Sequence, residues 1–232
     1  MPTFGTPGSR VPTSNRENTM TNQTTLHLDI PFPVWENLFA FTAPKDLRLP
    51  LRGYVVEVEA EHAYLMASDG ATLAAFRFPA AGHKDGHCAI PRVFIETTIA
   101  GVRVQIPARD RKLYPLRLEV DRANETCRAD TLNGISSDLV KGSFGLLRVR
   151  PSSALRNAHE RAHYNFNLLA KFEKLLGKTL LTKDKDEVFA YLTPYGKDAT
   201  GVIASPWDEN FFGLVMPLLR DGSTAPDFAF RS

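Results

Sequence analysis

The chain has 232 residues, of which 43% are hydrophobic and 23% charged, a composition that excludes wholesale disorder and fibrous repeats. Lys and Arg (28) nearly balance Asp and Glu (26), giving a net charge of +2, so contact with an acidic polymer requires a local basic patch. The chain has two cysteines, no apolar run of membrane-spanning length and no secretion-signal pattern, so we expect a cytoplasmic protein with neither disulfides nor a membrane partner.

The N-terminal part of the chain changes character near residue 25. Residues 1–24 are rich in Pro, Gly, Ser, Thr and Asn, which predicts a flexible tail and makes Met20 a candidate start. Alternating apolar residues over 25–30 predict a strand, and apolar residues at helical spacing predict a helix over 34–41. Three strands follow, over 53–59, 63–67 and 72–78.

The same order of elements recurs twice. The second copy has a strand at 87–90, a helix over 91–99 and a hairpin of 116–120 with 126–132. The third has a strand at 163–166, a helix over 168–176 that Gly177 ends, and strands near 188–192 and 213–216. This order predicts an α+β fold of repeated βαβββ units: a complete domain over 25–155, a half domain over 156–219 and a flexible C-terminal tail over 220–232.

One short motif is typical of zinc hydrolases. His159, Glu160 and His163 match the H-E-x-x-H pattern, in which two histidines hold zinc and the glutamate is the general base. No histidine follows His163 as a third ligand, so a zinc hydrolase remains a remote alternative. Other catalytic patterns are missing, and we expect a non-enzyme with no catalytic residue, metal or cofactor.

Two clusters of basic residues are candidates for contact with phosphates. In the third helix, Lys171, Lys174 and Lys178 fall within an arc of about 60° at 100° per residue. Arg103, Arg109, Arg111 and Lys112 form a second cluster between the second helix and the next hairpin. A solvated helix face would show the same pattern as a phosphate-binding one.

Three segments resemble one protein family in the same order along the chain. Residues 49–59 with 63–74 (LPLRGYVVEVE and AYLMASDGATLA) resemble the start of the middle domain of the bacterial sliding clamp, the beta subunit of DNA polymerase III. Residues 137–151 (SDLVKGSFGLLRVRP) are similar to the end of that domain. Residues 164–167 (YNFN) and 212–218 (FGLVMPL) are similar to the second half of the family's last domain.

This resemblance implies a DNA-clamp fold, with helices on the inner face of a ring and antiparallel sheets outside. Family rings close from twelve half-units, so three units per chain imply self-association into a tetramer. The implied function is that of a processivity factor at the replisome, which encircles double-stranded DNA without reading its sequence. Its DNA-contacting residues would be the two basic clusters together with Arg92 on the second helix.

The resemblance also implies a groove for short peptide motifs of polymerases, clamp loaders and repair proteins. Matching positions are Ser68, Gly70, Leu73, Pro151, Asn167, Leu214, Met216 and Pro217. The chain departs from the family at Ala71, Thr72, Ala170 and Leu219, where partner choice can differ. An alternative is a clamp-fold adapter or clamp regulator that forms no ring, in which the C-terminal Pro226–Phe230 segment resembles a clamp-binding peptide.

Overall fold

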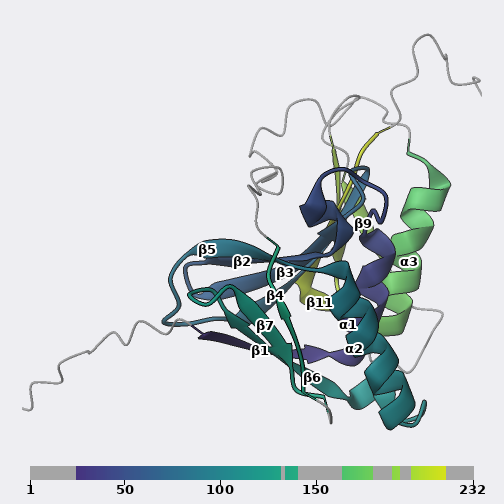
Figure 1. Ribbon diagram of the computed structural model, residues 1–232. Helices are drawn as coiled ribbons and strands as arrows, with labels where there is room; N and C mark the ends of the chain where they lie inside the picture. Colours follow the sequence, from purple (N-terminus) through teal and green to yellow (C-terminus); the bar gives the residue numbers. More distant parts are fainter. Residues whose placement is uncertain (1–24, 132–133, 141–163, 180–189, 194–199, 218–232) are drawn as a thin grey trace, which may run out of the picture.

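The chain forms two antiparallel sheets with three α-helices gathered at one side of them, among the residues that the computed structural model describes (Figure 1). Those residues are 25–131, 134–140, 164–179, 190–193 and 200–217. No helix in these ranges is both long enough and apolar enough to cross a bilayer. The His159–His163 motif, Pro151 and Pro226–Phe230 lie outside the described residues.

The elements predicted for the first unit are present in the predicted order, although the helix begins at Phe32 and its last turn is a 3-10 turn. Every second side chain of the first strand is buried, and two prolines start the helix directly after it. Two short 3-10 turns, η1 (Phe39–Phe41) and η2 (Leu49–Arg52), connect the helix to three antiparallel strands. The elements are β1 (Thr25–Pro31), α1 (Phe32–Leu38), β2 (Tyr54–Glu59), β3 (His62–Ser68) and β4 (Thr72–Pro79).

The second unit has a longer helix and one more strand than predicted. Its elements are β5 (Gly86–Ile90), α2 (Arg92–Gln105), a 3-10 turn η3 (Arg111–Leu113), β6 (Pro115–Asp121), β7 (Thr126–Ala129) and β8 (Ile135–Asp138). The helix continues past Ile99 because Val102 is fully buried and extends the apolar face of the helix by one turn. Strand β8 escaped prediction because a four-residue, half-polar segment carries little strand signal.

The third unit differs most from its prediction. It consists of α3 (Phe166–Thr179), β9 (Tyr191–Thr193), β10 (Gly201–Ser205) and β11 (Asp208–Val215). The predicted strand ending at Phe166 is wrong, since Phe166 is the first helical residue and the Asn165 side chain accepts the Asn167 N–H at 2.9 Å. The predicted stop at Gly177 is also wrong, because this exposed position tolerates glycine within the helix.

The first two units interlock by exchanging their first strands. The strand orders are β1-β6-β7-β8 in one sheet and β5-β2-β3-β4-β11-β10-β9 in the other. Thus β1 of the first unit pairs with β6 of the second, and β5 of the second pairs with β2 of the first. The third unit joins through a different contact, since its last strand β11 pairs with β4 and extends that sheet.

Aromatic side chains form the centre of the core between helices and sheets. Trp35 packs edge-on against Tyr54, whose hydroxyl donates a hydrogen bond to the Trp35 carbonyl. Phe172 of α3 lies between Phe41 and strand β11, where a β-carbon at Gly213 would collide with its ring. The core therefore joins α3 to both η1 and β11 and fixes the third unit against the first.

Candidate functional site

A pocket of about 160 Å³ lies where the β3–β4 turn meets the 48–51 segment and the end of β11. Four of its side chains are sizeable apolar ones, and an arginine is the one charged residue in the lining. The lining residues are Arg48, Leu51, Ser68, Gly70, Ala71, Thr72, Leu73, Thr200, Leu214 and Met216. An apolar hollow with few polar groups is typical of sites that accept an apolar side chain of a ligand.

The pocket brings together residues that sequence analysis had placed in a groove. Its lining includes Ser68, Gly70, Leu73, Leu214 and Met216 of the predicted set. Asn167 lies exposed at the start of α3, and neither it nor Pro217 lines the pocket.

Five lining residues lie outside the predicted set: Ala71 and Thr72, which were noted only as departures from the family, and Arg48, Leu51 and Thr200, which were not named at all. Leu51 lies within residues 49–59, a segment that resembles the family, and Arg48 directly precedes that segment. The resemblance of this segment was therefore the signal in the sequence that could have identified both residues. Thr200 precedes β10, a strand that was itself missed, and gave no signal.

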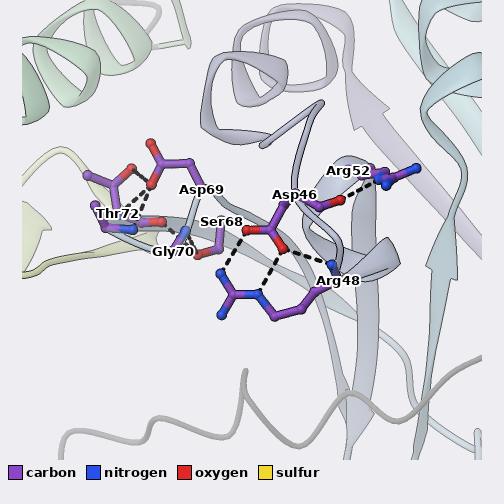
Figure 2. A network of polar contacts seen from close by, with 8 residues as sticks. Asp46, Arg48, Arg52, Ser68, Asp69, Gly70 and Thr72 are labelled. Carbon is purple, nitrogen blue, oxygen red and sulfur yellow. Dashed lines mark hydrogen bonds and ion pairs between the residues drawn. The ribbon is translucent and has the colours of Figure 1, made fainter.

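The turn between β3 and β4 is held by its own side chains (Figure 2). One oxygen of Asp69, Oδ1, accepts the N–H groups of Ala71 (2.9 Å) and Thr72 (2.7 Å) and the Thr72 hydroxyl (2.9 Å). The Ser68 hydroxyl donates to the Thr72 carbonyl at 2.8 Å and accepts the Gly70 N–H at 3.1 Å. Gly70 has φ +88°, a backbone conformation that favours glycine. The turn thus presents a fixed wall to the pocket.

A second polar network positions Arg48 (Figure 2). Its guanidinium group donates to both carboxylate oxygens of Asp46, at 2.9 and 2.8 Å, and Arg52 donates to the Asp46 carbonyl at 2.6 Å. These hydrogen bonds from Arg48 lower the pKa of Asp46 from 3.8 to about 2. Asp46 therefore holds the Arg48 side chain at the edge of the pocket.

The second oxygen of Asp69 forms an ion pair with Lys171 of α3. The lysine ammonium also lies 5.9 Å from the centre of the Phe41 ring. Burial raises the pKa of Asp69, but the hydrogen bonds from Lys171, Thr72 and Ala71 outweigh it, and the pKa is lowered from 3.8. Lys171 is therefore ion-paired with the turn that forms one wall of the pocket, whereas the sequence predicted it among the cations that face DNA.

A basic hollow of about 540 Å³ lies between α1, α3 and the 108–112 segment. It is lined by Phe32, Pro33, Glu36, Asn37, Ala108, Arg111, Lys112, Lys174, Gly177 and Lys178. The four cations come from both predicted basic clusters, which lie far apart in sequence and meet here because α3 packs against α1. No ion pair holds Lys112, Lys174 or Lys178 within the part of the chain that the structure describes.

The other predicted cations have local partners or lie apart from the hollow. Arg92 pairs with Glu96 at 2.7 Å and lies 4.3 Å above the Phe39 ring. Arg103 pairs with Glu36 at 2.7 Å, and Arg109 is largely exposed beside Asp110. Arg111 donates to the carbonyls of Ile106 and Arg103, which orders the backbone along one side of the hollow.

The described residues offer little to a metal or to covalent chemistry. They contain no group of three or more His, Cys, Asp and Glu side chains that could hold a metal ion. Burial raises the pKa of both thiols, Cys88 and Cys127, to about 12, so the reactive thiolate is scarce at neutral pH.

Known structures with a similar fold are bacterial sliding clamps. The DNA polymerase sliding clamp from Pseudomonas aeruginosa matches with a TM-score of 0.57 and 16% identity, over 84% of this chain and 67% of that one. The DNA polymerase III beta subunit from Thermotoga maritima matches with a TM-score of 0.60 and 13% identity, over 86% of this chain and 66% of that one. The C. crescentus beta sliding clamp matches with a TM-score of 0.53 and 15% identity, over 84% of this chain and 66% of that one.

These matches show that the chain has the sliding-clamp fold, as the sequence resemblance implied, and that it spans about two thirds of the length of those clamps. The α+β class with antiparallel sheets is likewise confirmed. No protein-family model and no curated protein sequence matches the chain.

Proposed function

We propose that this clamp-fold protein is a non-enzymatic tether that encircles duplex DNA as a ring of subunits and holds replication or repair proteins through short peptide segments. The observation that carries the proposal is the pocket between the β3–β4 turn and the end of β11. Its location would be the nucleoid, at the replisome. The chain would act by raising the local concentration of its partners and not by chemistry.

The pocket suits one class of ligand, an extended peptide with an apolar anchor. Leu51, Leu73 and Leu214 supply apolar surface, and Met216 supplies a flexible side chain that adapts to different anchors. Arg48, although paired with Asp46, keeps further guanidinium N–H groups that can donate hydrogen bonds to the peptide. Polymerases, clamp loaders and repair proteins with such segments are the proposed partners.

The basic hollow supports contact with DNA. Lys112, Lys174 and Lys178 are flexible cations without a rigid hydrogen-bonding fork, which suits attraction to phosphates and not readout of bases. Attraction of this kind depends on salt and permits movement along the duplex. The proposed ligand is therefore double-stranded DNA of any sequence.

An open sheet edge supports self-association. Strand β8 occupies the same outer place in its sheet as β4 in the other, and β4 pairs with β11. No strand pairs with the outer edge of β8 among the described residues. An exposed edge of this kind accepts a strand from another subunit. With three units per chain, the proposed ring of twelve units is a tetramer.

One observation favours a clamp-fold adapter that forms no ring. The outward side of α2 exposes Val93 and Val104, at 72% and 87%, and its two arginines are paired with glutamates. A helix that faces DNA is expected to present unpaired cations instead. In this second candidate the pocket has the same role but the chain does not enclose DNA.

The first experiment measures retention on circular DNA before and after linearisation. A ring stays on the circle and is lost from the ends, whereas an adapter shows no dependence on topology. The variant Lys174→Glu/Lys178→Glu should lose most retention, and Lys45→Glu/Lys84→Glu, which changes the net charge equally away from the hollow, should keep it. Equal losses in both variants would refute the role of the hollow.

A second experiment tests the pocket by fluorescence anisotropy with a labelled Pro-Asp-Phe-Ala-Phe peptide, the sequence of residues 226–230. Met216→Glu places a charge on a half-exposed pocket side chain and should weaken binding by roughly tenfold or more without lowering stability. Trp207→Glu is the control, since Trp207 is equally exposed and does not line the pocket. Unchanged affinity in Met216→Glu would count against the pocket.

A further inference from the structure

We infer that Lys171 is a positioning residue of the pocket: it holds Asp69 from helix α3 and thereby fixes the 68–72 turn that forms one pocket wall. The inference rests on the proposed function in one respect, the identity of the ligand that the pocket binds. The effect of the ion pair on the turn stands apart from that function and can be measured without any ligand.

The two oxygens of Asp69 have separate tasks. Oδ1 accepts three hydrogen bonds, all from Ala71 and Thr72 within the turn. Oδ2 faces Lys171, which lies 102 positions away in sequence. The carboxylate has no freedom to rotate while both sets of contacts persist, so the lysine fixes the orientation on which the three turn hydrogen bonds depend.

Lys171 is itself held firmly by its surroundings. Its neighbours on α3, Phe172 and Leu175, are buried, and the helix packs against α1 and β11. The side chain is 30% exposed, and the ammonium lies near the Phe41 ring. An ammonium held in this way behaves as a fixed anchor and not as a mobile surface cation.

The turn is hydrogen-bonded to the other wall of the pocket. The Ala71 carbonyl accepts the Met216 N–H at 2.8 Å, and Met216 and Leu214 belong to the other side of the pocket. A shift of the turn is therefore transmitted to the backbone at Met216. Lys174 and Lys178, on the same helix, face the basic hollow instead. One helix thus serves two sites through different lysines.

Hydrogen exchange measured by NMR tests the inference directly. In Lys171→Met the Ala71 and Thr72 amides should exchange roughly tenfold faster, the factor expected when a charge-assisted hydrogen bond is lost. Lys174→Met, the matched control on the same helix, should leave these amides unchanged, and Lys171→Arg should restore protection. Unchanged exchange in Lys171→Met, or the same increase in Lys174→Met, would overturn the inference.

A double-mutant cycle separates the ion pair from a general loss of stability. Asp69→Asn keeps the shape of the side chain and an oxygen acceptor but removes the charge, so it provides a second variant if Lys171→Met unfolds. The double variant should exchange no faster than Asp69→Asn alone, because without the carboxylate charge Lys171 has no ion pair left to lose. Additive increases would contradict the pairing.

The peptide assay distinguishes this inference from the proposed function. If the inference holds, the labelled Pro-Asp-Phe-Ala-Phe peptide binds Lys171→Met roughly tenfold more weakly, while retention on circular DNA stays at the wild-type level. If the wild-type chain does not bind the peptide but the turn amides respond as described, the peptide role fails and the positioning role stands. Loss of DNA retention in Lys171→Met equal to that in Lys174→Met would overturn it.

Discussion

The ring of Phe41 lies 4.9 Å from the ring of Phe172, nearly edge-on, and this pair joins the end of the first helical segment to α3. Both side chains are almost completely buried. The contact therefore carries part of the stability that holds the third unit against the first, and with it the geometry of the pocket that both units share.

Phe172→Ala should lower the free energy of unfolding by about 3–5 kcal/mol, the cost of emptying a buried aromatic site. Urea denaturation followed by tryptophan fluorescence measures it. Phe166→Ala on the same helix is the control, because Phe166 is 85% exposed and should change stability little. If Phe172→Ala lowered the free energy of unfolding as little as Phe166→Ala does, Phe172 would not be part of the core.

Asp69 should give the protein a pH-dependent component of stability. Its pKa is lowered in the folded chain, so its contribution is present above the ordinary value of 3.8 and disappears as the pH falls through the folded-state pKa. Asp69→Asn should be less stable than wild type at pH 7, and in thermal denaturation the gap should narrow as the pH falls below 3.8 and close below the folded-state pKa. Glu173→Gln, at an exposed position of α3, should show no such gap.

Both thiols should be inert in the folded protein. Their pKa values of about 12 leave almost no thiolate at pH 8, and both side chains are buried. A disulfide reagent should modify neither until guanidinium unfolds the chain, and then both. Because the pKa is raised, their contribution to stability is present below 9.0 and is lost as the pH rises toward 12. Rapid labelling of a native thiol would contradict this arrangement.

Two glycines should respond to alanine in opposite directions. Gly177→Ala lies within α3 with open space around the new methyl group and should stabilise the protein by about 0.5–1 kcal/mol. Gly213→Ala should destabilise it, because the methyl group meets the Phe172 ring. Thermal melts of the two variants provide the comparison. A stabilising Gly213→Ala would show that the ring moves aside readily.

Local patterns in the sequence predicted most elements, because strand alternation over 25–30 and the turn around Asp69-Gly70 depend on neighbouring residues. The order of the sheets could not be predicted in this way. The exchange of β1 and β5 between units is a choice among distant partners, and each strand alone is compatible with several neighbours.

In the candidate site, too, residues within sequence motifs could be predicted, whereas contacts between distant segments could not. The family resemblance located the apolar residues of the pocket, such as Leu73 and Met216, because they lie in the motifs themselves. A helical wheel placed Lys171, Lys174 and Lys178 together, but it could not show that Asp69 takes the first of them. The helical wheel also could not show that Lys112 and Lys174 line the same hollow, because this depends on how α3 packs against α1.

The pairing of β11 with β4 also affects how the chain folds. Arg77 and Asn210, which hydrogen-bond across this pair at 3.2 Å, are 133 positions apart, so the contact closes a long loop and should form late. The interlocked first two units can assemble before this pairing forms, because none of the strand pairs within these two units involves β11. The pocket is completed only when β11 pairs with β4, so a chain in which this long-range contact has not yet formed lacks one wall of the pocket.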